Sequence, residues 1–263
     1  MREAREETAG GAGPLNRAPR LAVLIDADNA SPKIAGDLFR EIAKIGEASV
    51  RRIYGDFSSG QLASWLKVLP EHAILPQMNQ ANTTGKNASD IALVIDAMDL
   101  LHTGRFDGFC LVSSDSDFTR LAARIREQGV AVYGFGQEKT PKSFVQACQR
   151  FIYTENFVVS EAPTSQGEAQ GEAPKRPGGR KSPEDAMPLF IKAMGELAED
   201  SEYVHLGALG QLIANMEPDF DPRSYGCAKL SSLVEKTGRF EIERNDGFGV
   251  QIRLLPKPKP RRG

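Results

Sequence analysis

The chain has 263 residues, of which 40% are hydrophobic and 26% are charged, and its formal net charge is −2. This length and composition fit a globular protein with one main core and a smaller second one. The small net charge excludes a chain that is basic throughout, although a local basic patch still permits RNA binding. No apolar run reaches the length of a membrane span, so no membrane partner is expected.

The cysteines and the first residues indicate where the chain resides. Cys110, Cys148 and Cys227 are odd in number and scattered, so they fit neither a disulfide framework nor zinc-ligand spacing. A reducing cytoplasm is the natural setting for such a chain. Residues 1–19 are charged and rich in small residues without a hydrophobic segment, which predicts a disordered tail rather than a signal peptide.

Apolar runs alternate with amphipathic segments over residues 20–159, which we expect to form the first domain. This alternation predicts an α/β fold, a mostly parallel sheet sandwiched by helices. Ser31 is the expected N-cap of the first helix, and Gly129 is an expected helix stop. The expected strands are Leu21–Ile25, Ser49–Tyr54, Ala73–Met78, Gly108–Ser113 and Val130–Gly136. The expected helices are Pro32–Ile45, Gln61–Leu69, Ala88–Thr103, Phe118–Gln128 and Pro141–Cys148.

Composition changes after the first domain. Residues 160–181 have almost no large apolar side chain, which predicts a flexible linker. A second, small α+β domain is expected over 182–255, starting at the capped helix end Ser182-Pro183. Its expected helices are Pro183–Glu199, Leu206–Met216 and Pro222–Gly238, followed by strands Phe240–Arg244 and Phe248–Leu254 around an Asp246-Gly247 turn. Three helices and a terminal hairpin outline a winged helix, and residues 256–263 form a basic tail.

Four carboxylates lie where the predicted sheet should form a site: Asp26, Asp90, Asp115 and Asp117. Asp26 ends the first strand, Asp115 and Asp117 follow the fourth, and Asp90 opens the helix after the third. Sites in open α/β sheets form outside the carboxyl ends of the strands, where strand order reverses. A divalent cation relieves repulsion among clustered carboxylates, and it would activate a water to attack phosphorus. We therefore expect Mg²⁺ or Mn²⁺ at a phosphoryl-transfer or nuclease site.

Each of these acids also has a simpler interpretation as a helix cap or turn residue, most directly Asp115 and Asp117 before the helix near Phe118. Convergence of all four favours a site. Neighbouring polar residues have paired interpretations as well. Asn29 either holds Asp26 or a ligand, or forms an Asx-turn. Candidate phosphate contacts are Lys86, Ser113 and Ser114. The alternative for Lys86 is an ordinary exposed lysine in a loop. The alternative for the two serines is hydrogen bonding to backbone groups at the strand ends.

Three ordered motifs resemble the NYN domain, a PIN-like nuclease family: Leu21-Ala-Val-Leu-Ile-Asp26-Ala-Asp-Asn29, Gly85-Lys-Asn-Ala-Ser-Asp90-Ile-Ala-Leu-Val-Ile-Asp96 and Ser113-Ser-Asp115-Ser-Asp117-Phe118. The resemblance implies a PIN-like parallel sheet and an acidic site that binds one or two divalent ions for RNA cleavage. By motif position, Asp26 matches the first-strand acid and Asp90 the acid opening the middle helix. Asp115 and Asp117 match the acidic pair after the fourth strand.

The second domain resembles the LOTUS (OST-HTH) domain in the segments Leu206–Met216, Phe220–Gly226, Lys229–Glu235 and Phe240–Glu243. This resemblance implies binding of RNA and, for some members, of a protein partner. Arg223, Tyr225 and Lys229 are the candidate contacts to single-stranded or structured RNA, through phosphates and base stacking. Their alternative is an ordinary surface or boundary position.

Together the two domains predict a metal-dependent ribonuclease whose second domain captures RNA. The main alternative is a non-catalytic RNA-binding or scaffold protein that retains the fold. A haloacid-dehalogenase-type phosphatase is disfavoured, because its DxDx[TV] loop would place Thr or Val where Ala30 stands and leaves Asp90 without a role. The sequence gives no prediction of oligomeric state.

Overall fold

The computed structural model describes residues 17–57, 62–78, 88–161, 181–198, 202–245 and 249–255. The interior of the expected linker, most of both tails and the turn on Asp246 and Gly247 lie outside these ranges.

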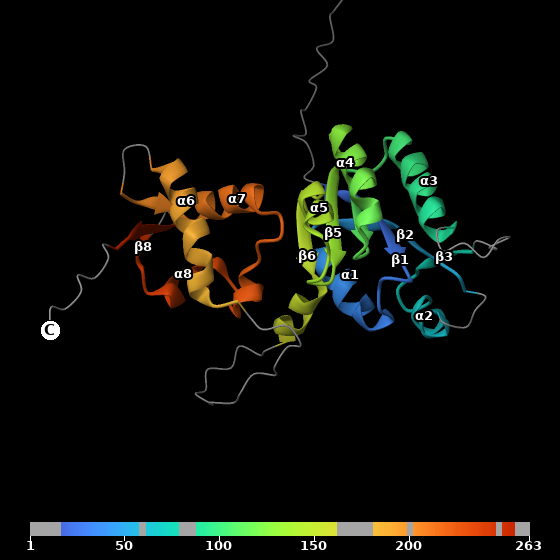
Figure 1. Ribbon diagram of the computed structural model, residues 1–263, viewed down its shortest axis with the longest axis horizontal. Helices are drawn as coiled ribbons and strands as arrows, with labels where there is room; N and C mark the ends of the chain where they lie inside the picture. Colours follow the sequence, from blue (N-terminus) through green and yellow to red (C-terminus); the bar gives the residue numbers. More distant parts are fainter. Residues whose placement is uncertain are drawn as a thin grey trace, which may run out of the picture.

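The first domain is built on a six-stranded sheet in which all neighbouring strands are parallel (Figure 1). The strand order is β3-β2-β1-β4-β5-β6, so it reverses between β1 and β4. The strands are β1 (Arg20–Asp26), β2 (Glu47–Gly55), β3 (Leu75–Met78), β4 (Gly108–Val112), β5 (Ala131–Gly136) and β6 (Arg150–Tyr153). The reversal places the carboxyl ends of β1 and β4 side by side, at the position where such sheets bind ligands.

Helices cover both faces of this sheet, as the alternating sequence predicts. The helices are α1 (Ala35–Ala43), α2 (Ala63–Val68), α3 (Ala88–His102), α4 (Thr119–Glu127) and α5 (Lys142–Ala147). One apolar core lies under α3, α4 and α5 and the other under α1 and α2 (Figure 1). Strand β1 serves both cores, with Ala22 and Leu24 on one face and Leu21, Val23 and Ile25 on the other. Burial on both faces explains its uninterrupted apolar run.

Short 3₁₀ turns join several of these elements: η1 (Pro32–Ile34), η2 (Ser116–Phe118) and η3 (Thr154–Glu161). The N-cap prediction for Ser31 is confirmed, because its side chain accepts a hydrogen bond from the Lys33 amide. The helix stop at Gly129 is also confirmed, since this residue has a φ of 76°. Strand β6 is absent from the predicted elements. It is a four-residue edge strand that starts almost directly after α5, too short for a clear periodic pattern.

The second domain packs helices against a small antiparallel sheet of order β7-β9-β8. Its elements are η4 (Pro183–Ala186), α6 (Met187–Leu197), β7 (Val204–His205), α7 (Leu206–Met216), η5 (Pro222–Tyr225), α8 (Leu230–Thr237), β8 (Phe240–Asn245) and β9 (Gly249–Leu254). The predicted capped start is confirmed, since Ser182 and Asp185 form a capping box. The single helix predicted over Pro222–Gly238 is wrong. Gly226 adopts a left-handed conformation with a φ of 72°, which ends η5 and separates it from α8.

The fold class predicted from the sequence is therefore confirmed for both domains. None of the helices in the described ranges has the length and apolar character needed to cross a bilayer.

Gly136, at the end of β5, tests how tightly the strand ends are packed. A Cβ atom at this position would lie 2.6 Å from the Ser113 carbonyl oxygen and 2.8 Å from Thr140 Oγ1. We expect Gly136→Ala to lower the free energy of unfolding by about 2 kcal/mol, because overpacking displaces backbone. Gly195 in α6 is the matched control, since a Cβ atom there would have no neighbour within 4 Å. Gly195→Ala should be neutral or stabilising in urea titrations, and equal losses for both variants would contradict the close approach.

Candidate active site at the strand-order reversal

The site is organised around Asp26, the last residue of β1, whose side chain is 1% exposed. Its Oδ1 accepts hydrogen bonds from the amides of Asp28 at 3.1 Å and Asn29 at 3.3 Å. Its Oδ2 accepts from Asn29 Nδ2 at 2.8 Å and from Ser113 Oγ at 2.7 Å. Of the two interpretations of Asn29, the structure shows the one in which this side chain holds Asp26. Four donors thus fix the carboxylate in one orientation.

Burial and hydrogen bonding act on Asp26 in opposite directions. Burial raises the pKa of its carboxyl, because the charged form loses water. The hydrogen bonds from Ser113, Asn29 and Asp28 oppose that effect without cancelling it, and the net shift is upward. An additional positive charge near this carboxylate would therefore be favourable.

The loop after β4 approaches Asp26 through Ser113. Ser113 Oγ donates to Asp26 and accepts from the Asp115 amide at 3.0 Å. Asp115 Oδ1 accepts from the Asp117 amide at 2.9 Å, so Asp115 is also the N-cap of η2. Ser114 Oγ accepts from the Gln137 amide at 2.9 Å. Both serines thus have internal partners at the strand ends, as the alternative to phosphate binding predicted.

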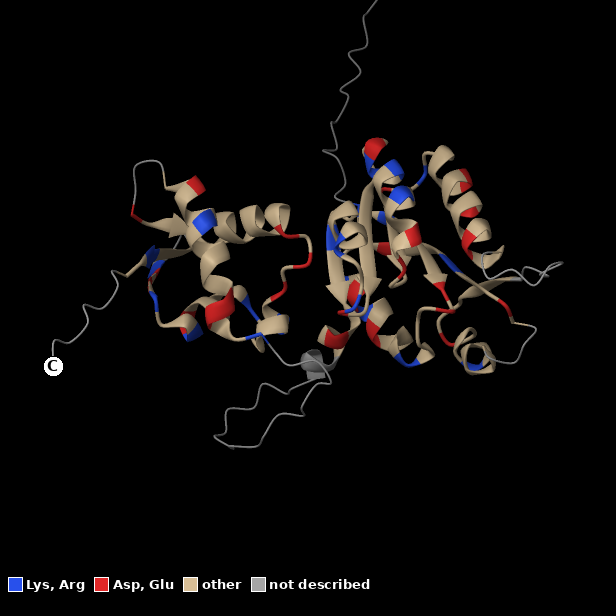
Figure 2. Ribbon diagram, viewed as in Figure 1, with Lys and Arg blue, Asp and Glu red and all other residues tan. Residues whose placement is uncertain are grey.

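Asp90 enters the site from the first turn of α3. The pKa of its carboxyl rises to about 6, first because of partial burial and then because of the charges of Asp26, Asp115, Asp28 and Asp117. The structure therefore brings the four predicted acids within electrostatic range of one another. Helix α3 adds no compensation, since its three charged residues are all aspartates (Figure 2).

The donors present suit a hard divalent cation. Carboxylate and hydroxyl oxygens are the ligands that Mg²⁺ and Mn²⁺ prefer, and the raised pKa of Asp90 shows that negative charge accumulates here. Within the described ranges, no three carboxylate, imidazole or thiol groups come together closely enough to enclose an ion. Mg²⁺ commonly keeps several waters and uses only one or two carboxylates. The residues fit an ion held in that open manner rather than in a closed protein cage.

Asp96 and the three histidines have partners outside the group of four acids. Asp96, in the middle of α3, pairs with Arg52 and accepts a hydrogen bond from the Tyr54 hydroxyl, so it fastens the helix to β2. The three histidines also have separate partners. His72 stacks on Phe39, His102 contacts the Met98 carbonyl oxygen, and His205 contacts Gln251.

The remaining predicted contacts are dispersed. Lys86 lies outside the described residues. In the second domain, Lys229 is exposed at the N-cap of α8. The Tyr225 ring is half-buried, 5.9 Å from the Phe220 ring and 5.7 Å from Lys181 Nζ. Arg223 corrects the expectation of an open phosphate contact, because its side chain is only 12% exposed and pairs with Asp221 and with Glu41 of the first domain.

Sequence reasoning missed Glu41 as a functional residue, although one signal was present. Glu41 is 6% exposed and lies among the buried positions of α1, which include Leu38 and Ile42. A carboxylate on the apolar stripe of an amphipathic helix requires a buried partner, but the sequence does not reveal which residue supplies it.

The six-stranded parallel sheet flanked by helices is a PIN-like fold. The chain belongs to the NYN domain family, whose model matches residues 20–156, and an OST-HTH/LOTUS domain follows at residues 184–250. NYN domains are nuclease-type domains that typically use divalent metals, and OST-HTH/LOTUS domains are RNA-binding modules. Both resemblances inferred from the sequence motifs are confirmed.

Two solved structures of bacterial proteins are similar to parts of the chain. A crystal structure of a protein of unknown function, VPA0982 from Vibrio parahaemolyticus, is 18% identical with a TM-score of 0.43, covering 53% of this chain and 94% of its own. A solution structure of an uncharacterized protein from locus NE0665 of Nitrosomonas europaea is 24% identical with a TM-score of 0.28, covering 40% of this chain and 98% of its own. None of the curated proteins compared with the chain matches it. The family assignment rests on the two domain matches.

Asp90→Asn tests the electrostatic arrangement without RNA. A carboxyl whose pKa is raised by folding destabilises the fold as pH rises from its ordinary value of 3.8 to about 6. Without added metal, we expect Asp90→Asn to stabilise the protein at pH 7.5 by about 1 kcal/mol after allowing for solvent screening. The gain should shrink as pH falls through 6 and disappear at about pH 3, below both pKa values, where the folded and unfolded states both carry a protonated acid. Thermal unfolding at the two pH values measures it.

The control is Asp99→Asn, on an exposed position of the same helix. Its stability should change little at either pH. A carboxylate in the first turn of a helix also interacts favourably with the helix N-terminus, by about 0.3–1 kcal/mol. If Asp90→Asn lowers the stability at pH 7.5, this favourable interaction outweighs the repulsion between Asp90 and the other acids, and the prediction is wrong.

Proposed function

We propose that the protein is a ribonuclease that cleaves RNA phosphodiesters with the help of Mg²⁺ or Mn²⁺ bound at Asp26, Asp90, Asp115 and Asp117. The observation that carries the proposal is the position of these acids at the reversal of strand order, where partial burial and the charges of the other three raise the pKa of Asp90. Among the described Lys and Arg residues, none forms an ion pair with any of the four.

The four acids differ in environment, which suggests different tasks. Asp26 is buried and held by four donors, so it suits an ion ligand of fixed orientation. Asp90 and Asp115 are partly exposed and Asp117 is exposed, so their carboxylates remain accessible to an ion, water or substrate. When bound, the ion would supply charge neutralisation at the phosphate and an activated water. Asn29 and Ser113 would act by positioning Asp26.

The second domain is proposed to capture single-stranded or structured RNA. Its family match supports RNA binding, and the exposed Lys229 at the start of α8 is the predicted contact that stays open. We also propose that this domain binds a protein partner. The two domains are proposed to span residues 20–159 and 182–255, with a linker at 160–181 between them. The three unpaired, buried cysteines support a cytoplasmic setting.

A second candidate function is RNA binding without catalysis. It is favoured by the observation that Asp26 and Asp115 both already satisfy backbone amides, Asp115 as a helix cap. Under this alternative the acids maintain loop geometry, and their charge is incidental. The two candidates differ in what happens when charge is removed but hydrogen-bond acceptance is kept.

Asp115→Asn makes that distinction, because Asn and Asp are equally good N-caps. If the charge serves catalysis, Mn²⁺-dependent cleavage of a labelled single-stranded RNA should fall by roughly 100-fold or more, at least the effect of losing a supporting group in a metal site. RNA binding without metal should change little. Gel analysis of the products and fluorescence anisotropy measure the two properties, with Asp99→Asn as the charge-matched control.

Metal binding gives a second measurement that does not depend on turnover. Mn²⁺ should raise the melting temperature of the wild type, since a ligand that binds only the folded state stabilises it. The rise should be blunted in Asp115→Asn and retained in Asp99→Asn. RNA binding by a folded wild-type protein with neither cleavage nor a metal-induced shift would support the non-catalytic alternative.

A further inference from the structure

A short segment of the second domain, residues 218–224, contacts the first domain, and we call it the docking segment. The Phe151 amide of β6 donates to the Pro218 carbonyl oxygen at 2.8 Å, so the segment covers the outer edge of the sheet. At the end of β6, the Tyr153 hydroxyl donates to Asp219 Oδ2 at 2.8 Å. An unpaired strand edge is thereby partly satisfied, which is one way proteins prevent unwanted strand pairing.

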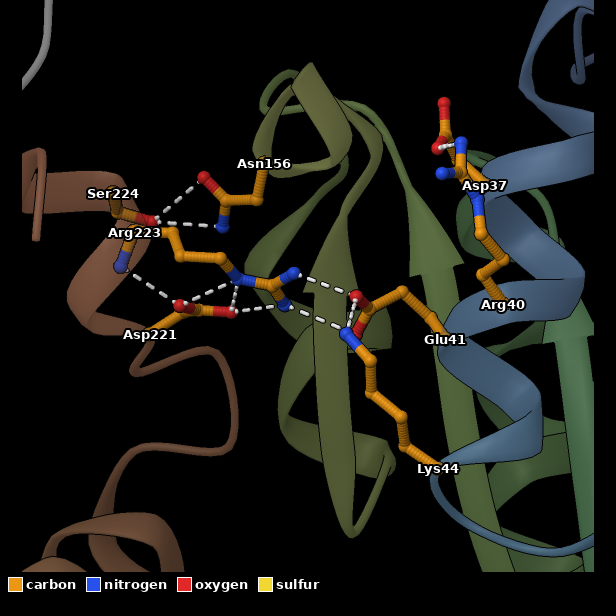
Figure 3. Close-up of polar contacts among 8 residues, drawn as sticks. All are labelled: Asp37, Arg40, Glu41, Lys44, Asn156, Asp221, Arg223 and Ser224. Carbon is orange, nitrogen blue, oxygen red and sulfur yellow. Dashed lines mark hydrogen bonds and ion pairs between the residues drawn. The ribbon is translucent and has the colours of Figure 1, made fainter. Parts of the chain in front are cut away.

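Buried polar contacts continue the interface beyond the sheet edge. Asn156 is 0% exposed and donates through Nδ2 to Ser224 Oγ at 3.0 Å, and Ser224 is 7% exposed (Figure 3). Neither residue was singled out from the sequence. Buried polar side chains that hydrogen-bond to each other indicate a specific contact, because separating the domains would exchange each of these hydrogen bonds for one to water.

The centre of the interface is Arg223, which joins acids of both domains (Figure 3). Its two Nη atoms reach Glu41 Oε1 at 2.8 Å and Oε2 at 3.2 Å. Its Nε and Nη2 contact Asp221 at 2.7–3.0 Å. Asp221 also accepts from the Arg223 amide at 2.8 Å as the N-cap of η5. The guanidinium is thus held by its own domain in an orientation that presents a two-pronged contact to the other.

Charge in this network is balanced. Glu41, Asp221 and Arg223 have side-chain exposures of 8%, 7% and 12%, and Lys44 adds a contact to Glu41 Oε1 at 2.5 Å. Burial alone raises the pKa of Glu41, but the bonds and charges of Lys44 and Arg223 outweigh it, and the net pKa is lowered. Removing one member of such a buried network leaves an uncompensated charge, which is strongly unfavourable.

Part of the interface lies toward the same end of the sheet as the acidic site. Strand β6 is separated from β4 by β5 alone, so the two strands are about 10 Å apart. Tyr153 ends β6 and Asn156 follows it, and in a parallel sheet this is the same end at which Asp26 and Asp115 lie. The docking segment precedes α8, β8 and β9 in the chain and leaves Lys229 exposed.

We infer that Arg223 is a positioning residue, which clamps the RNA-capturing domain to the nuclease-type domain and so fixes where captured RNA meets the acidic site. This inference rests on the proposed function for its consequence, but the clamp itself is independent of it. It assigns Arg223 to an interdomain role in place of the phosphate contact expected from the sequence.

Two conservative variants separate the roles. Arg223→Lys keeps the positive charge that would attract phosphate but loses the planar fork that contacts both acids. Glu41→Gln lies in the other domain and removes the carboxylate charge that pairs with Arg223 and with Lys44. If Arg223 clamps the domains, both variants of the full chain should show an increased radius of gyration in small-angle X-ray scattering, and their combination should add little beyond either alone. Arg253→Lys, in an exposed pair with Glu241 inside the second domain, is the control and should leave scattering unchanged.

Cleavage then tests the consequence. On a long end-labelled RNA, the wild type should cut within a narrow window, and both clamp variants should widen that window at least twofold. Total cleavage of a short oligonucleotide that engages only the acidic site should be unchanged. Wild-type scattering for both variants would overturn the clamp. So would a large loss of RNA affinity in Glu41→Gln with no change in scattering. If the wild type cleaves nothing, the proposed function fails, while the scattering result still decides whether the clamp exists.

Discussion

One constraint organises the first domain: a carboxylate has to be accommodated at the buried end of the central strand. Strand β1 is covered on both faces, so Asp26 reaches the edge of the sheet while still excluded from water. A buried acceptor needs donors, and these come from Asn29 in its own loop and from Ser113 after β4. Ser113 in turn receives the Asp115 amide. Satisfying one acid therefore aligns the two loops that contain most of the candidate site.

The other buried acids of the protein differ from those of the candidate site, because they are paired with basic side chains. Glu41 and Asp221 share Arg223, and Asp96 has both Arg52 and the Tyr54 hydroxyl. Each of these carboxylates is neutralised by the protein itself and serves architecture. At the strand-order reversal, by contrast, partial burial and the charges of the neighbouring acids together raise the pKa of Asp90. Such an arrangement costs stability, and clusters of this kind are characteristic of functional sites.

The sequence predicted the elements whose patterns are long and locally determined. The run Leu21–Ile25 and helix α7 are examples, since burial of the run on both faces and an apolar stripe on the helix leave clear signatures. The acids at strand ends could be placed at one edge of the sheet because all strands of a parallel sheet end at the same edge. The predictions that failed depend on local backbone geometry or on contacts across the chain. The break at Gly226 requires a left-handed backbone that the flanking helical pattern concealed, and strand β6 exists because β5 and the docking segment are beside it.

Arg223 shows most clearly why surface chemistry resists prediction from sequence. In the sequence, an arginine near an aromatic residue and a helix start is indistinguishable from a phosphate contact. What decides its role is Glu41, 182 positions away, on a helix of another domain. Because Asp221, two positions away in the same domain, also holds the guanidinium, the fork is oriented for one partner geometry rather than for the variable phosphates of RNA. In the proposed arrangement, the segment before Gly226 docks on the first domain, and the exposed start of α8 after it is available for RNA.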